Sequence, residues 1–156
     1  DVNHRSRLWT DRDPVPVYRE LVASSDIVFA GEDEAALVVG GTASTVTFSD
    51  DELIAGLAAL GPREVVLKRG AAGATARDGD ETLSVPAVPV SVVDSVGAGD
   101  TFWGNCLADW TLEPDHVPQR VARTLQLAMA AAAINCTRTG CQPPTSAELL
   151  AATTSA

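Results

Sequence analysis

The stretch that decides the fold is Asp94-Ser95-Val96-Gly97-Ala98-Gly99-Asp100-Thr101-Phe102. Its two glycines allow a sharp turn and carry no side chain that would block a close approach. A glycine-rich turn that leads into a helix leaves backbone N–H groups unpaired, and these favour an anion such as a phosphate. Apolar residues follow at helical spacing, which predicts a helix that begins where the glycines end: Phe102, Cys106 and Trp110.

Asp100 lies where the turn becomes the helix, and its residue type supports two interpretations. A carboxylate at a helix start can serve as an N-terminal cap. Beside a transferring phosphoryl group, the same carboxylate could act as a general base that accepts a proton from an attacking hydroxyl. The glycines and the aspartate alone leave both interpretations open.

The segment from Asp94 to Gly104 resembles the second signature of the ribokinase-like (PfkB) sugar kinases, whose usual form is DTTGAGDTF. Trp103, Asn105 and Cys106 depart from the small and aliphatic residues that are usual there. The resemblance implies that Asp100 is the catalytic base and that three backbone amides stabilise charge on the transferred group: those of Gly97, Ala98 and Gly99. It also implies a doubly wound, mainly parallel sheet flanked by helices.

The length and composition fit one folded domain of 156 residues, with 46% hydrophobic residues and a net charge of −10. This charge disfavours nucleic acid and anionic membranes as partners. The sequence has no apolar run of spanning length and no basic leader, so we expect a cytoplasmic protein. The three cysteines lack CxxC spacing, which favours reduced thiols, at least two of them buried, over a disulfide or zinc site.

Strand and helix patterns alternate along the chain, which indicates a parallel, doubly wound sheet. Residues 26–30 and 64–68 read as buried strands, and residues 75–77 and 81–85 as a hairpin. Residues 90–93 read as an extended edge. We expect Val17, Leu21 and Val22 to form the buried face of the first helix. The predicted helices span residues 14–23, 31–40, 50–60, 117–135 and 146–151, with a loop at 113–116.

The opening segment, residues 1–9, resembles the D-x-N-x-R-x-x-L-W segment of 2-keto-3-deoxygluconate kinases. That segment lies near the middle of a full-length enzyme. The resemblance therefore implies that residues 1–156 are the C-terminal, nucleotide-binding half of a kinase domain, without the N-terminal half and the lid. It also places Asn3 and Arg5 at the substrate, where an amide and a guanidinium suit hydroxyls and carboxylates. The alternative is that Arg5 is a solvated loop charge.

A second resemblance concerns the residues that would hold the nucleotide and its ions. The family carries N-x-x-E where this chain has Gly31 to Glu34, which implies an indirect Mg²⁺ role for Glu34; a surface acid that complements the helix dipole is the alternative. Asp94, with carbonyls of the 137–143 turn, resembles a monovalent cation site, which implies K⁺ as a further cofactor. Met129 would lie near adenine. The family's T-L-G-x-x-G nucleotide loop corresponds to Lys68, Arg69, Gly70, Ala71, Ala72 and Gly73, with Lys68 expected to supply positive charge.

The reaction implied by these resemblances is the ATP-dependent, Mg²⁺-assisted phosphorylation of a sugar or sugar-acid hydroxyl. The opening segment favours 2-keto-3-deoxygluconate as the acceptor. A fructokinase or a deoxyketogluconate kinase of inositol breakdown stays open, as does a noncatalytic fragment that binds nucleotide or a partner subunit. We expect residues 1–156 alone to be weakly active or inactive. An exposed sheet edge favours a homo-oligomer or a complementary N-terminal half as partner.

Overall fold

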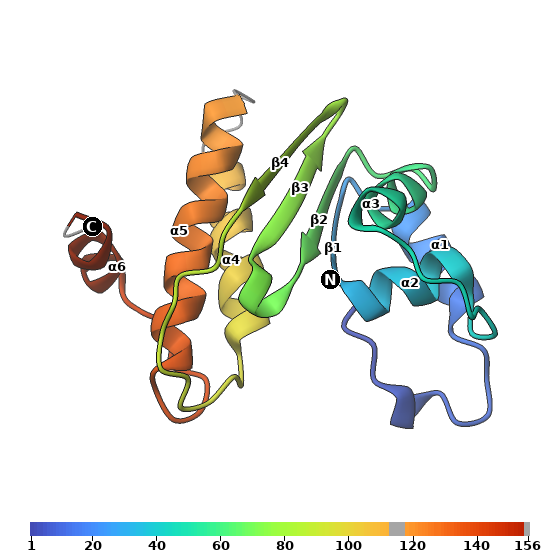
Figure 1. The fold of residues 1–156 in the computed structure, drawn as a ribbon, viewed down its shortest axis with the longest axis horizontal. Coiled ribbons are helices and arrows are strands. Elements are labelled where there is room, and N and C mark those ends of the chain that lie inside the picture. The colour runs from blue at the N-terminus through green and yellow to red at the C-terminus, as the bar shows by residue number, and fades with distance from the viewer. Residues whose placement is uncertain (113–117, 155–156) are drawn as a thin grey trace. The chain divides into compact units, whose positions relative to one another are not determined.

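The structure is a computed structural model, and it describes residues 1–112 and 118–154. The chain divides into two compact units, and Figure 1 labels the helices and strands within them. The first unit comprises residues 1–69 and 75–83, and the second comprises residues 70–74 and 84–156. This division was not predicted from the sequence. The loop predicted at 113–116 lies outside the described residues.

Twelve elements are described, two of them short 3₁₀ helices named η. In chain order they are η1 (Ser6–Leu8), α1 (Val15–Ala23), β1 (Ile27–Gly31), α2 (Glu32–Gly40), α3 (Asp50–Ala58), β2 (Glu64–Lys68), η2 (Gly70–Ala72), β3 (Ala74–Asp78), β4 (Glu81–Val85), α4 (Ala98–Leu112), α5 (Pro118–Cys136) and α6 (Ser146–Thr154). None of these helices combines the length and the apolar character needed to cross a bilayer.

The four strands form one sheet in the order β1-β2-β3-β4. The predicted parallel pairing is confirmed for β1 and β2, whose register runs from Ile27 opposite Glu64 to Gly31 opposite Lys68. The connections from β2 to β3 and from β3 to β4 are too short for a parallel crossover, so these neighbours are antiparallel and the sheet is mixed. The predicted hairpin of β3 and β4 is confirmed, and Gly79 in its turn has a φ of +58°.

The core of the first unit lies between the strands β1 and β2 and the helices α1, α2 and α3. The strands contribute side chains at every second position, as expected for one face of a sheet. The side chains on the opposite face of β1 and β2, Phe29 and Val66, are buried too. The buried core residues are Tyr18, Val22, Val28, Ala30, Ala35, Val38, Leu53, Ile54, Leu57, Val65 and Leu67.

The predicted buried face of α1 is wrong for two of its three residues. Val17 and Leu21 are 42% and 59% exposed, whereas Val15, Tyr18 and Val22 are buried. Positions 15, 18 and 22 share one side of a helix, and positions 17 and 21 lie on the adjoining side. Tyr18 is buried because its ring packs in the core while its hydroxyl shares a hydrogen bond with the ring of His4.

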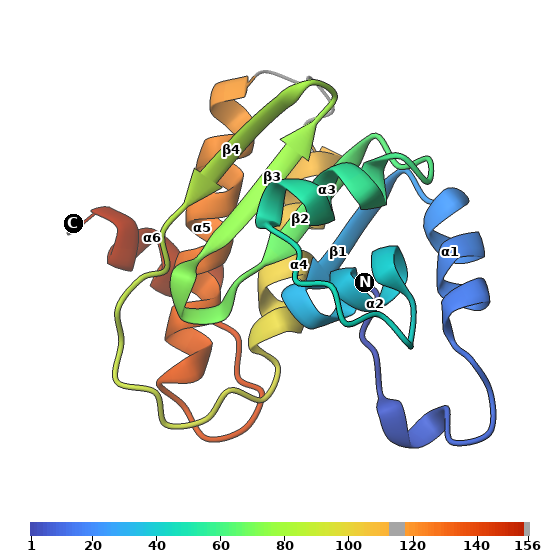
Figure 2. The ribbon, with the colours of Figure 1, turned by 45° about the vertical axis from the view of Figure 1, so that its right-hand side comes forward.

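In the second unit, α4 and α5 pack along each other, as Figures 1 and 2 both show. The predicted apolar face of α4 is confirmed, since Phe102, Cys106 and Trp110 are all buried. Residues 90–93 do not form a strand, contrary to expectation. Instead, the N–H groups of Val93 and Asp94 both donate to the carbonyl of Cys136, over 2.8 and 3.2 Å.

The three cysteines are free thiols in three different environments. Cys106 is buried, Cys136 is half-buried and Cys141 is exposed, so only one is fully inside, against the two expected. Burial raises the pKa of the Cys106 thiol far above its ordinary value, which keeps this cysteine protonated and unreactive.

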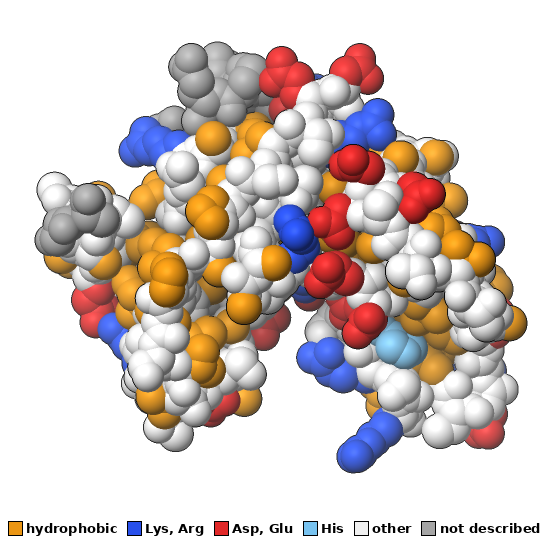
Figure 3. Space-filling view, in the orientation of Figure 1, with side chains coloured by type: hydrophobic (Ala, Val, Ile, Leu, Met, Phe, Trp, Pro, Cys, Tyr) orange, Lys and Arg blue, Asp and Glu red, His pale blue; other side chains and the backbone are white. Residues whose placement is uncertain are grey.

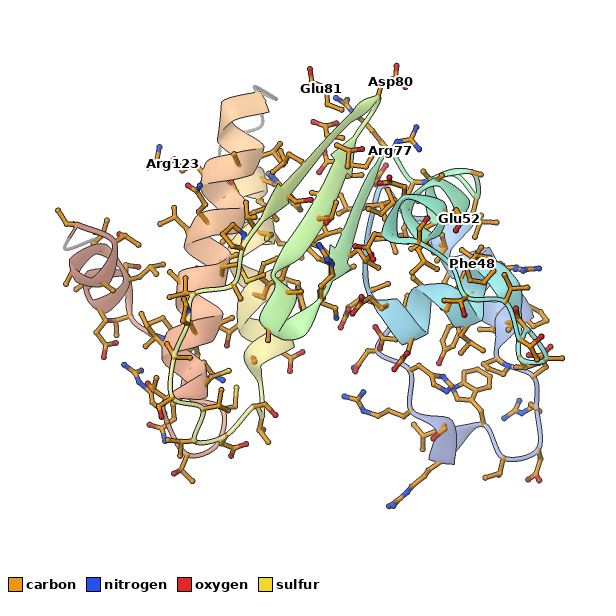
Figure 4. All side chains as sticks on the ribbon, viewed as in Figure 1. Phe48, Glu52, Arg77, Asp80, Glu81 and Arg123 are labelled. Carbon is orange, nitrogen blue, oxygen red and sulfur yellow. The ribbon has the colours of Figure 1, made fainter. Side chains whose placement is uncertain are left out.

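Two helices begin with the same reciprocal cap. Ser49 precedes α3, which carries Glu52 in its first turn, and Thr145 precedes α6, which carries Glu148 (Glu52 is labelled in Figure 4). In each pair the hydroxyl accepts the glutamate N–H over 3.3 Å, and the carboxylate accepts the N–H of the capping residue over 2.7 Å. These caps satisfy helix donors that would otherwise lack partners.

Candidate functional site

The turn that enters α4 leaves several backbone donors available. Gly97 has a φ of +75°, and its carbonyl accepts the N–H of Thr101 over 2.8 Å. The N–H of Ala98 donates to the carbonyl of Ser95 over 3.1 Å, so the expectation that Ala98 offers a free amide needs correction. Within the described part of the chain, the amides of Gly97, Gly99 and Asp100 make no backbone hydrogen bond. These three donors lie at the positive end of the helix dipole.

Gly97 cannot be replaced by a larger residue without a rearrangement. A Cβ atom built on it would lie 2.1 Å from Sγ of Cys141, far inside van der Waals contact. Its positive φ also disfavours any residue with a side chain. The turn is therefore held in place from behind by the loop that carries Cys141, a neighbour that the sequence pattern did not reveal.

The carboxylate of Asp100 is exposed in the first turn of α4. Its Oδ1 accepts a hydrogen bond from the indole Nε1 of Trp103 over 3.2 Å. Among the described residues no backbone N–H donates to this carboxylate, so the capping interpretation is not supported. Asp100 is thus accessible and lies in the same helical turn as the open amides. Trp103 was noted in the sequence only as a departure from the family pattern.

The next side chain, Thr101, is 6% exposed and its Oγ1 has no hydrogen-bond partner in the described structure. A buried hydroxyl without a partner is costly in a folded protein. It is a second polar group near the start of α4 whose hydrogen bonding is incomplete.

Asp94 connects the turn before α4 to the loop that follows α5 through two hydrogen bonds. Its Oδ1 accepts the N–H of Val96 over 3.0 Å, and its Oδ2 accepts the N–H of Gly140 over 2.8 Å. The hydrogen bonds from these two amides lower the pKa of Asp94 below its ordinary value, because they stabilise the charged form. The carboxylate is therefore ionised and structurally engaged.

Asn135 is a residue of this site that sequence reasoning missed. It is fully buried near the end of α5, where its Nδ2 donates to the carbonyl of Val96 over 2.9 Å and its Oδ1 accepts the N–H of Gln142 over 2.8 Å. The side chain thereby connects the turn before α4 with the loop after α5. An asparagine among buried alanines is a polar residue that must find partners, and this signal could have identified it.

The predicted nucleotide loop, residues 68–73, spans the boundary between the two units. In the first unit, Lys68 and Arg69 are both in ion pairs. Nζ of Lys68 lies 2.5 Å from Oδ1 of Asp1, and Nε of Arg69 lies 2.9 Å from Oδ2 of Asp50. The Lys68 ammonium, which was expected to supply positive charge to a nucleotide, therefore lies against a carboxylate.

In the second unit, the backbone of residues 70–73 forms a tight turn. The helix η2 covers Gly70, Ala71 and Ala72, and the N–H of Gly73 donates to the carbonyl of Gly70 over 3.1 Å. Gly73 has a φ of +99°, and a Cβ atom on it would lie 2.0 Å from the carbonyl oxygen of Val85. Met129, the expected adenine neighbour, is half-buried on α5.

Glu34 lies in the first turn of α2, and each of its carboxylate oxygens is occupied. Oε1 accepts the N–H of His4 over 2.8 Å, and Oε2 accepts the N–H of Gly31 over 2.7 Å. Nζ of Lys68 lies 3.9 Å from Oε2. The carboxylate is therefore held rigidly, and only its remaining lone pairs are available to a metal-bound water.

A cleft of about 480 Å³ opens beside Glu34 in the first unit. This volume lies in the range of small-molecule sites. Figure 3 shows acidic side chains, in red, close to a histidine, in pale blue, on the face of the molecule that it displays. In the described ranges, no group of three or more His, Cys, Asp or Glu residues could hold a metal ion unaided. The cleft is lined by His4, Gly31, Glu32, Asp33, Glu34 and Lys68.

Each unit thus brings together part of the predicted site. The first unit joins Glu34 and Lys68 and holds the segment with Asn3 and Arg5, both exposed. The second unit joins Asp94 with the turn at 97–100 and the loop at 137–141. The first group can support a charged ligand through fixed side chains, and the second offers open amides beside a carboxylate.

Comparison with characterised relatives shows similarity to sugar kinases. The chain is 31% identical over 147 residues to a fructokinase of Klebsiella pneumoniae, covering 90% of this chain and 45% of the relative. It is 33% identical over 110 residues to a 2-dehydro-3-deoxygalactonokinase of Haloferax volcanii, covering 69% and 33%.

Solved structures agree with this similarity. A putative ribokinase II from E. coli in complex with ATP and Mg²⁺ matches with a TM-score of 0.76 at 29% identity, over 90% of this chain and 43% of that chain. A fructokinase double mutant from Vibrio cholerae, bound to fructose, ADP and potassium, matches with a TM-score of 0.84 at 25% identity, over 96% and 47%.

The chain spans less than half the length of each of these proteins. Its fold matches part of ribokinase-like proteins, an α/β fold with a mixed sheet flanked by helices. Residues 1–148 match the family described as pfkB family carbohydrate kinase. This match covers nearly the whole chain, and the chain belongs to the pfkB family of carbohydrate kinases.

Proposed function

We propose that residues 1–156 form the phosphoryl-transfer portion of a kinase that uses ATP to phosphorylate a hydroxyl of a sugar or sugar acid. The observation that carries the proposal is the start of α4, where the amides of Gly97, Gly99 and Asp100 lack backbone partners in the part of the chain that the structure describes, beside the exposed Asp100 carboxylate. Family membership supports the same reaction class.

In the proposed mechanism, the Asp100 carboxylate accepts the proton of the acceptor hydroxyl while that oxygen bonds to the γ-phosphorus and ADP departs. The open amides donate hydrogen bonds to the charge that grows on the transferred group. Trp103 holds the Asp100 carboxylate in place through its indole N–H. When bound, ATP supplies the phosphoryl group and Mg²⁺ neutralises part of its charge.

The residues present fit these groups. Because the chain offers no cluster of three metal ligands in its described part, Mg²⁺ would depend on the nucleotide phosphates, as is usual for this ion. Glu34 would act on it through a bound water. Within the second unit, the nucleotide would lie against Gly70 to Gly73, with Met129 near the base.

Asp94 belongs to the proposed site of a monovalent cation, with carbonyls of the 137–143 turn as the other ligands. The solved fructokinase that contains potassium supports this proposal. Turnover in K⁺ compared with Li⁺ or choline at equal ionic strength tests it. Equal rates in all three salts would exclude a cation role for Asp94.

For the acceptor, we propose 2-keto-3-deoxygluconate. The support is the exposure of Asn3 and Arg5, which leaves an amide and a guanidinium available to hydroxyls and a carboxylate. The relative named as a 2-dehydro-3-deoxygalactonokinase fits an acceptor of this class. A fructokinase is the second candidate, because the relative from Klebsiella pneumoniae aligns over more of the chain.

A panel assay tests the proposal and separates the candidates. The purified chain, and a chimera with the N-terminal half of a pfkB kinase before residue 1, are incubated with ATP, Mg²⁺ and each acceptor while ADP release is measured. We expect the chimera to turn over sugar acids faster than fructose. Calorimetric binding of ATP without any turnover in either form would favour a noncatalytic nucleotide-binding protein instead.

A further inference from the structure

The segment that carries Asn3 and Arg5 has no helix or strand of its own, yet its backbone has a defined conformation. Burial alternates from residue 2 to residue 5, with Val2 and His4 half-buried and Asn3 and Arg5 exposed. Asn3 has a φ of +45°, the only positive value found for a non-glycine residue within the described ranges. Such a conformation persists when surrounding contacts hold it.

His4 supplies these contacts from the position between the two exposed residues. Its backbone N–H donates to Oε1 of Glu34 over 2.8 Å. Its ring Nδ1 shares a hydrogen bond of 3.0 Å with the hydroxyl of Tyr18, and the two rings meet edge to face with centroids 5.7 Å apart. His4 is therefore attached both to α1 and to the first turn of α2.

The partners of His4 are themselves fixed. Tyr18 is 7% exposed, and Trp9 packs against its ring with centroids 5.4 Å apart. Glu34 is held by the N–H of Gly31, and Lys68 links it to Asp1 at the start of the segment. The attachment thus connects the segment to the core of the first unit and not to solvent-exposed side chains.

The N–H of Val2 adds one more attachment, since it donates to the carbonyl of Phe29 on β1 over 3.0 Å. Residues 1, 2 and 4 are all attached to β1, α2 or β2. Asn3 and Arg5 are left as the side chains that face outward, apart from a 3.2 Å bond from Nη1 of Arg5 to the carbonyl of His4. That bond also depends on the placement of His4.

We propose that His4, Tyr18 and Glu34, here called the His4 anchor, are positioning residues that orient Asn3 and Arg5 toward the phosphoryl acceptor. The inference rests on the proposed function. The family pattern D-x-N-x-R leaves position 4 open, and the structure assigns it a role. The His4 anchor affects acceptor affinity by holding residues 1–5 in place. It contacts neither the acceptor nor the nucleotide.

The first test needs no activity. Amide hydrogen exchange of the ¹⁵N-labelled chain is measured by NMR for Glu34→Gln, His4→Ala and Tyr18→Phe. We expect exchange of the His4 amide, which donates to Glu34, to accelerate at least tenfold in Glu34→Gln and His4→Ala, and severalfold in Tyr18→Phe. Glu32→Gln is the matched control, because Glu32 lies in the same helical turn and makes no hydrogen bond or ion pair among the described residues. It should change exchange less than twofold.

The second test is kinetic and uses whichever form of the enzyme turns over. Tyr18→Phe should raise the acceptor KM at least threefold while kcat and the KM for MgATP stay within twofold, and Arg7→Gln should change none of them. Unchanged exchange in all three anchor variants would overturn the anchor. Altered exchange with an unchanged acceptor KM would overturn its role in acceptor binding. If the wild type phosphorylates no acceptor, the proposed function fails, the acceptor role fails with it, and the exchange data still decide whether the anchor exists.

Discussion

In the first unit, the two basic side chains of the predicted nucleotide loop already have partners: Lys68 lies against Asp1 and Glu34, and Arg69 against Asp50. In the second unit, as far as the described residues show, the start of α4 presents amides without backbone partners and a carboxylate that accepts a single hydrogen bond, from the indole N–H of Trp103. The basic side chains of Lys68 and Arg69 are thus neutralised by nearby carboxylates, whereas the polar groups at the start of α4 are available to a ligand.

This difference suggests how an acidic chain with a net charge of −10 can receive a phosphate. Paired charges fix geometry without a strong field, because each cation is compensated by a nearby carboxylate. Open amides at a helix start favour an anion through hydrogen bonds and the dipole. We therefore propose that the first unit positions ligands and that the second unit stabilises charge.

The largest expected effect tests the open region directly. Asp100→Asn should lower kcat by about 10²–10⁴, because the amide cannot accept the hydroxyl proton. Nucleotide affinity measured by calorimetry should change little, since the open amides remain. Turnover near the wild-type value would remove Asp100 from the chemistry and with it the proposed division between the units.

The next effect concerns the backbone that presents the amides. Gly97→Ala should destabilise the protein by about 2–5 kcal/mol, since it combines a strained φ with a collision against Cys141. Thermal unfolding measures the loss. Gly104→Ala is the matched control, because Gly104 lies inside α4 and a Cβ there meets nothing within 4 Å. It should stabilise the helix by about 0.5–1 kcal/mol. Equal effects of the two substitutions would contradict the close approach at Gly97.

A smaller effect is expected from the paired region. Lys68→Gln should cost about 1–2 kcal/mol, between the values for exposed and fully buried ion pairs, because the Lys68 and Asp1 side chains are 21% and 14% exposed. Urea unfolding measures this cost. Arg63→Gln breaks a pair in which the arginine is 61% exposed, and it should cost at most about 0.5 kcal/mol. A Lys68 variant as stable as the Arg63 variant would show that the pairing in the first unit is incidental.

The smallest effect is a dependence on pH in both units. Hydrogen bonds from the backbone N–H and hydroxyl of Ser49 lower the pKa of Glu52, and those from Thr145 lower the pKa of Glu148, each from an ordinary value of 4.5. Because these pKa values are depressed in the folded state, the caps contribute fully above pH 4.5, and their contribution is lost as the pH falls through the folded-state values.

Amide exchange at Ser49 and Thr145 between pH 6 and pH 3 measures this loss. We expect protection at both residues to fall with acid, and to be independent of pH in Glu52→Gln and Glu148→Gln, whose side chains do not titrate. A loss at only one cap would show that the two units differ in acid stability as well as in charge pairing.

Several features could be predicted from the sequence because they depend on local chemistry. The strand at 64–68 was predicted with its observed bounds, and the burial of Phe102, Cys106 and Trp110 follows from their helical spacing. The hairpin followed from Gly79 in its turn. The predicted buried face of α1 was wrong. Which of two neighbouring helix faces becomes buried depends on what packs against the helix, and here His4 and Trp9 pack against Tyr18.

The sequence by itself determined the order of strands and helices, the position of Asp100 at a helix start and the membership of a kinase family. Only the tertiary structure decided which charges are already paired, which amides stay open, and that Asn135 and Cys141 lie behind the glycine turn. The physical reason is the distance along the sequence between interacting residues. Backbone turns and helical faces depend on residues only a few positions apart. The partners of Lys68, Asn135 and Gly97 are brought from 67, 39 and 44 positions away by packing of the whole chain.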